Sequence, residues 1–116
     1  MKSQVVARLV LVVGMTSLGF AHAVLLEVTP APNGTLVGPD INIQLRFNSR
    51  IDSGRSRLAL VLPDRSVRAL RVEQQSSPAT LNARMTGLAT GAYTLQWQVL
   101  AADGHITRGE VAFQIR

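Results

Sequence analysis

The feature that most constrains the fold is the alternation of apolar and polar residues in several short segments. Every second residue is apolar over residues 41–47, 93–99 and 111–115. A period of two places alternate side chains on one face of a β-strand. Because no segment shows a sustained helical period, the sequence predicts an all-β fold.

Further short apolar runs and turn-forming residues divide the chain into about seven strands. The additional runs cover residues 24–28, 58–62, 67–72 and 81–85. Turn-forming residues occur at positions 30–34, 38–40, 52–54, 63–64 and 103–104. This pattern predicts an all-β, two-sheet antiparallel β-sandwich with Greek-key links.

Three local patterns refine this expectation. Residues 88–93 read Leu-Ala-Thr-Gly-Ala-Tyr, which is typical of a tyrosine corner in an Ig-like sandwich. Trp97 lies on the same strand face as Tyr93 and is expected in the core. Residues 74–80 are polar and include a proline, so we expect an exposed loop there.

The first 21 residues have the layout of a secretory signal peptide. Lys2 and Arg8 precede an apolar run of residues 9–20, which ends in small residues. That run is shorter than the roughly 20 residues a membrane-spanning helix needs, so a retained anchor is less favoured. We expect residues 1–21 to be removed and residues 22–116 to form one domain. Cleavage after Ala23 is the alternative.

The absence of cysteine excludes several kinds of site. The chain has no disulfide, no thiolate metal site, no Cys nucleophile and no blue-copper centre. Loss of residues 1–21 also removes two of the three methionines, so a thioether Cu(I) site is not expected. Serine hydrolase chemistry is not supported, because no nucleophile elbow is present.

The only two histidines are the most informative residues for function. Cleavage before His22 would give a terminal amine and an Nδ1 that can close a chelate ring on one metal ion. Asp103 and His105 are two residues apart, so in extended backbone they face the same side. Three nitrogens and one oxygen suit Cu(II) better than Zn(II) or Ca(II). His22, Asp103 and His105 are therefore the candidate metal ligands.

Other interpretations of these residues remain open. Asp103-Gly104 is also a common hairpin turn, and a histidine after such a turn is often merely exposed. Seven of the arginines lie within residues 46–71, where they indicate either a solvated strand face or a surface for a partner. Nucleic acid binding is not expected, because the surface lacks an aromatic stacking set.

Residues 91–116, GAYTLQWQVLAADGHITRGEVAFQIR, resemble the C-terminal pattern of the CopC-type copper-resistance proteins of the bacterial periplasm. The N-terminal half is similar as well, through Thr29-Pro30 and Asn33-Gly34. The resemblance implies an Ig-like or cupredoxin-like Greek-key β-sandwich in which His22, Asp103 and His105 hold one Cu(II) per chain. It also implies a non-enzymatic periplasmic carrier or buffer, which we expect to be a monomer, sometimes paired with an inner-membrane copper transport protein of the CopD type.

One segment departs from the family pattern. Many members carry an acidic residue just after the phenylalanine that matches Phe47, whereas this chain has Asn48, Ser49 and Arg50 in that segment. Two other functions stay open: a metal-free interaction module that uses the arginine segment, and a copper oxygenase with a histidine brace. The oxygenase is disfavoured because the domain is small and Asp103 would fill a position that oxygen needs.

Overall fold

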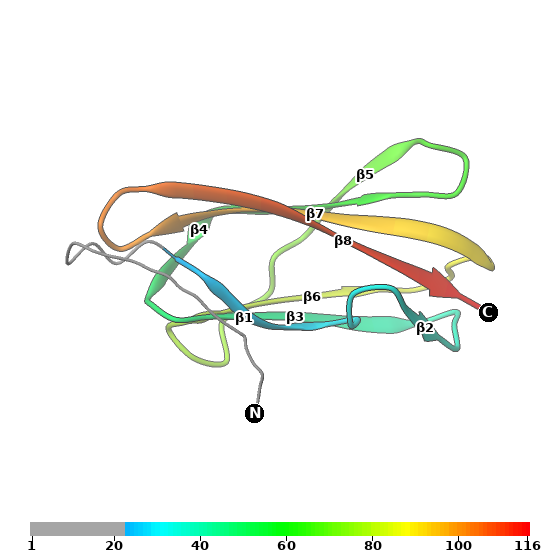
Figure 1. Ribbon diagram of the computed structural model, residues 1–116, viewed down its shortest axis with the longest axis horizontal. Helices are drawn as coiled ribbons and strands as arrows, with labels where there is room; N and C mark the ends of the chain where they lie inside the picture. The colour runs from blue at the N-terminus through cyan, green and yellow to red at the C-terminus, as the bar shows by residue number, and fades with distance from the viewer. Residues whose placement is uncertain (1–22) are drawn as a thin grey trace, which may run out of the picture.

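Eight β-strands account for all regular secondary structure in residues 23–116, the part of the chain that the computed structural model describes. The strands are β1 (Leu25–Thr29), β2 (Gly34–Leu36), β3 (Ile41–Phe47), β4 (Ile51–Val61), β5 (Val67–Leu70), β6 (Thr80–Met85), β7 (Gly91–Ala101) and β8 (Ile106–Ile115). They form a three-stranded sheet, β1-β3-β6, and a five-stranded sheet, β2-β8-β7-β4-β5. Figure 1 shows the two sheets as stacked layers. Within these residues no helix could cross a membrane.

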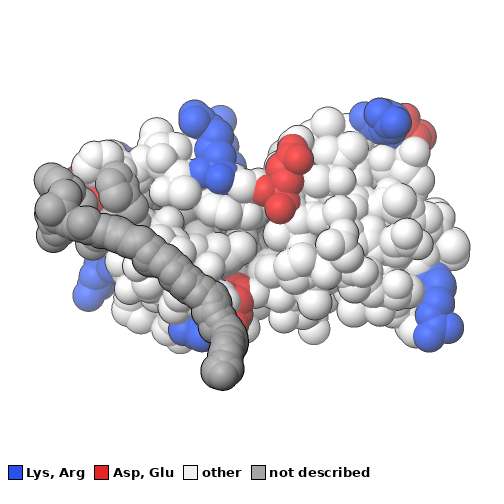
Figure 2. Space-filling view, in the orientation of Figure 1, with Lys and Arg blue, Asp and Glu red and all other residues white. Residues whose placement is uncertain are grey.

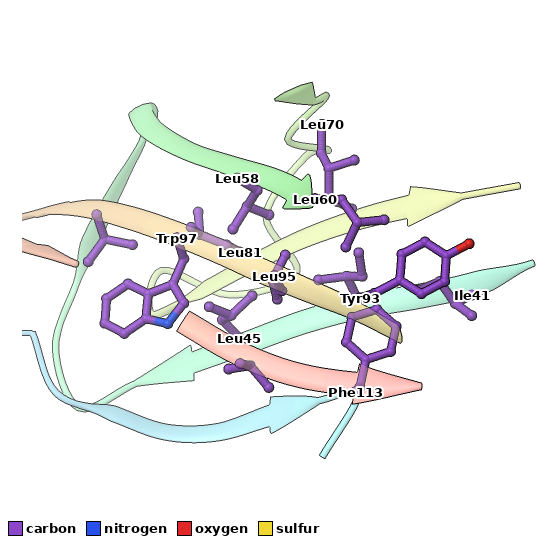
Figure 3. Packing of buried hydrophobic residues seen from close by; sticks show 14 of the residues in the cluster. Ile41, Leu45, Leu58, Leu60, Leu70, Leu81, Tyr93, Leu95, Trp97 and Phe113 are labelled. Carbon is purple, nitrogen blue, oxygen red and sulfur yellow. The ribbon is translucent and has the colours of Figure 1, made fainter. Parts of the chain in front are cut away.

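The predicted alternation builds the core between the two sheets. In β3 the residues Ile41, Ile43, Leu45 and Phe47 are buried and the three residues between them are exposed. The buried side chains of β7 and β8 meet them from the other layer, as Figure 3 shows. Burial of this apolar surface is the main force that holds the sheets together. The all-β sandwich prediction is confirmed.

Two features of the strand pattern differ from the expectation. The short strand β2 was not predicted, and it pairs with β8 in parallel rather than antiparallel orientation. The turn expected at residues 52–54 lies inside β4, where the pairing with β7 shifts register between Asp52 and Arg57. Ser56 Oγ bonds the Asp52 carbonyl at 2.7 Å and accepts from the Leu100 N–H at 3.1 Å. The turn-forming residues therefore make a bulge and do not reverse the chain.

The expected tyrosine corner is present. The Tyr93 hydroxyl donates to the Ala89 carbonyl at 2.5 Å, four residues upstream. Trp97 is 8% exposed and meets the Phe47 ring edge-on, with 5.4 Å between ring centroids. In the loop that was expected to be exposed, Thr80 is buried because it begins β6.

Gly109 allows the Trp97 indole to lie across β8. A Cβ at Gly109 would clash with Cζ2 of Trp97 and lie 2.8 Å from its Nε1. We expect Gly109→Ala to lower the free energy of unfolding by about 1–3 kcal/mol, the usual range for overpacking. Urea denaturation measures this. Gly54→Ala is the matched control, because a Cβ there meets nothing closer than 3.6 Å. Equal stability of the two variants would contradict the packing explanation.

Candidate metal centre

The turn that joins β7 to β8 carries both described candidate ligands. The Gly104 N–H bonds the Ala101 carbonyl at 2.9 Å, and the Ala101 N–H bonds the His105 carbonyl at 2.9 Å. Gly104 has a φ of +89°, a conformation that favours glycine. The hairpin interpretation of Asp103-Gly104 is therefore correct, and this turn fixes how its neighbours are presented.

The same turn brings Asp103 and His105 into direct contact. His105 Nδ1 lies 3.0 Å from Asp103 Oδ2, and the His105 backbone N–H donates to Asp103 Oδ1 at 3.0 Å. The Asp103 side chain is 21% exposed and the His105 side chain is 50% exposed. One carboxylate thus bonds both the backbone and the ring of the same histidine, which orients the imidazole at the surface.

The start of the described chain is anchored at the end of β3. Ala23 is buried in the core at 1% exposure. The Val24 N–H donates to Asn48 Oδ1 at 2.8 Å, and the Asn48 N–H donates to the Val24 carbonyl at 3.0 Å.

Further along β1, Glu27 makes an exposed ion pair with Arg46. The hydrogen bond from Arg46 lowers the pKa of Glu27 below its ordinary value, and the positive charge of Arg46 lowers it further.

A single segment, residues 47–51, links this anchored start to the hairpin. On one side, Asn48 bonds Val24, and the Arg50 carbonyl accepts from the Ala102 N–H at 3.1 Å. On the other side, the N–H groups of Phe47 and Ile51 donate to the carbonyls of residues 79 and 78 at 2.8 and 2.9 Å. We call residues 47–51 the bridge segment. Figure 1 shows the start of β1 and the β7–β8 hairpin at the same end of the sandwich.

The third candidate ligand, His22, lies outside the described residues. Within residues 23–116, no three His, Cys, Asp or Glu side chains form a group able to hold a metal ion. The structure thus brings Asp103 and His105 together, as predicted, and the full ligand set remains a prediction.

Comparison with known proteins decides the family. A family model for the CopC domain matches residues 25–116. This chain belongs to the CopC family. It is therefore a member of a family of copper resistance proteins.

Two curated relatives of this CopC domain cover most of its length. Protein YobA of Escherichia coli strain K12 is 28% identical over 100 residues, which is 84% of this chain and 81% of YobA. Copper resistance protein C of Xanthomonas campestris pv. juglandis is 26% identical over 105 residues, with 84% and 82% coverage.

Solved structures support the fold of this CopC domain. CopC from Methylosinus trichosporium OB3b superposes with a TM-score of 0.73 at 23% identity, covering 81% of this chain and 93% of that one. PcoC, a methionine-rich copper resistance protein from Escherichia coli, gives a TM-score of 0.68 at 22% identity, with 83% and 100% coverage. At these identities the likeness concerns the architecture.

The arginine-rich segment of this CopC domain does not form one patch. All seven arginines of residues 46–71 are exposed. Arg46 lies on the three-stranded sheet, where it pairs with Glu27, whereas Arg55 and Arg57 lie on the five-stranded sheet. Figure 2 shows basic side chains at separate places on the face in view. This distribution agrees with a solvated strand surface.

The contacts that the bridge segment makes were not predicted from the sequence. Asn48 was noted only as one of three residues that depart from the family pattern, whereas in the structure its side-chain oxygen accepts from the backbone N–H of Val24. The partner lies 24 residues away, so no local motif reveals the contact. The position of Asn48 directly after the alternating strand β3 was the one available signal.

Proposed function

We propose that this CopC-family protein binds one Cu(II) ion through the terminal amine and imidazole of His22, with Asp103 and His105, after residues 1–21 are removed. The observation that carries the proposal is the contact of 3.0 Å between His105 Nδ1 and Asp103 Oδ2. A nitrogen and an oxygen that both suit Cu(II) lie side by side at the surface, at the end of the sandwich where the described chain begins.

The separation of these two atoms is an ordinary hydrogen-bond distance, 3.0 Å. The contact brings one nitrogen and one oxygen donor to the same place on the surface. Cu(II) accepts both kinds of donor in a square-planar or tetragonal arrangement.

The anchored start of β1 supports a role for His22. Ala23 is buried, and the Val24 N–H donates to Asn48 Oδ1. Two positions after Asn48, the Arg50 carbonyl accepts from the Ala102 N–H in the hairpin. We propose that cleavage before His22 adds the amine and imidazole of that residue to this anchored start.

The exposure of the site favours carriage or buffering over catalysis. The His105 side chain is 50% exposed, so an incoming ligand on another protein can reach a metal ion held there. Copper resistance protein C of Xanthomonas campestris pv. juglandis is named for resistance. We propose that this chain is an exported, periplasmic, monomeric, non-enzymatic copper carrier that exchanges its ion with a CopD-type membrane protein.

A metal titration tests the proposal. We expect a chain that begins at His22 to bind one equivalent of Cu(II), and to keep it in the presence of excess Zn(II), because Cu(II) forms the more stable complexes with such ligands. Competition with a coloured chelator measures both. Several weakly bound copper ions per chain, or displacement by zinc, would contradict a specific Cu(II) site.

A further inference from the structure

We infer that Asn48 is a positioning residue of the copper site, which holds the start of the chain against the β7–β8 hairpin without touching the metal. The inference rests on the proposed function, because it concerns how His22 would be aligned with Asp103 and His105. It assigns a task to one residue of the segment, Asn48 to Arg50, that departs from the family pattern.

The Asn48 side chain bonds the backbone of Val24 just before β1, where the pairing of β1 with β3 has ended. β1 begins at Leu25, and its register with β3 shifts between Leu25 and Glu27. Val24 precedes the strand and is half exposed. Its N–H is bonded by Asn48 Oδ1 at 2.8 Å, and its carbonyl accepts from the Asn48 N–H at 3.0 Å. Only the first of these two bonds depends on the identity of the side chain.

The next residues of the bridge segment connect Asn48 to the β7–β8 hairpin. Two positions after Asn48, the Arg50 carbonyl accepts from the Ala102 N–H, next to Asp103. Between them, Ser49 Oγ is buried and has no hydrogen-bond partner among the described residues. Because Phe47 and Ile51 are bonded to residues 78–79, the segment cannot move freely to follow a displaced Val24. Loss of the Asn48 contact therefore frees Val24 rather than the hairpin.

Two substitutions separate the hydrogen bond from other properties of the side chain. Asn48→Ala removes the acceptor and leaves the backbone bond, so we expect Cu(II) affinity to fall roughly 10- to 100-fold, as when a supporting residue of a metal site is lost. Asn48→Asp keeps an oxygen acceptor for the Val24 N–H and should hold the affinity near that of the unmodified chain. Asn42→Ala is the matched control, an exposed asparagine in β3, the strand that ends just before Asn48.

The test measures Cu(II) affinity for these variants in a chain beginning at His22 and in one beginning at Ala23. If Asn48 acts by aligning His22, Asn48→Ala weakens binding in the first chain and has no further effect in the second, because coupled residues give non-additive changes. An equal effect in both chains, or none in the first, would overturn the inference while leaving the copper site in place. If the unmodified chain beginning at His22 binds no copper, the proposed function fails and the inference fails with it.

Discussion

Replacing His105 by alanine is expected to weaken Cu(II) binding by more than the roughly 10- to 100-fold that loss of a supporting residue costs. The substitution removes a proposed ligand and also the ring that Asp103 bonds at 3.0 Å. Chelator competition measures the affinity. Since the His105 side chain is half exposed, the free energy of unfolding should change by no more than about 0.5 kcal/mol. Unchanged copper affinity would show that the site lies elsewhere.

A pair of aspartates supplies the control for this result. Asp103 Oδ1 accepts from the N–H two residues later, at 3.0 Å, and Asp64 Oδ1 makes the same contact with Ser66 at 2.9 Å. Asp103→Asn and Asp64→Asn thus perturb equivalent turns, but only Asp103 contacts a histidine. We expect copper affinity to fall in the first variant alone. A similar fall in both would indicate an effect of turn structure or net charge.

Adding one glycine before His22 is expected to reduce Cu(II) affinity by a factor as large as that expected for His105→Ala. The addition keeps the imidazole and every described contact, but it moves the free α-amine out of the chelate ring of His22. A chain that begins at Ala23 lacks the α-amine and the imidazole of His22, so it should bind Cu(II) at least as weakly as the chain with the added glycine. Competition titration of the three chains measures the effect. Equal affinity for all three would exclude a terminal chelate and leave a surface site made by Asp103 and His105.

The long strands of the fold were predictable because each has one buried face. The alternation of apolar and polar residues in β3 predicts which of its side chains face the core. The tyrosine corner indicates the start of β7. The strand β2 was missed because three residues are too few to show a period. Asp52 and Gly54 were interpreted as a turn because their intrinsic preference is the same in a bulge, and only the pairing of β4 with β7 distinguishes the two.

The candidate site was predictable where its residues are neighbours in sequence. Asp103 and His105 are two residues apart, and extended backbone was expected to turn them to the same side. The structure brings the two side chains together by a turn instead. The role of Asn48 depends on a contact between two strand ends, which no local pattern encodes. The participation of His22 stays a prediction, because it depends on where the chain is cleaved.

Native mass spectrometry of the protein recovered from the periplasm, after expression of the full-length chain and addition of one equivalent of Cu(II), tests the central claim most directly. The account predicts a single species whose mass begins at His22 and includes one copper ion. A mass that begins at Val24, or a species that begins at His22 but retains no copper, would contradict it.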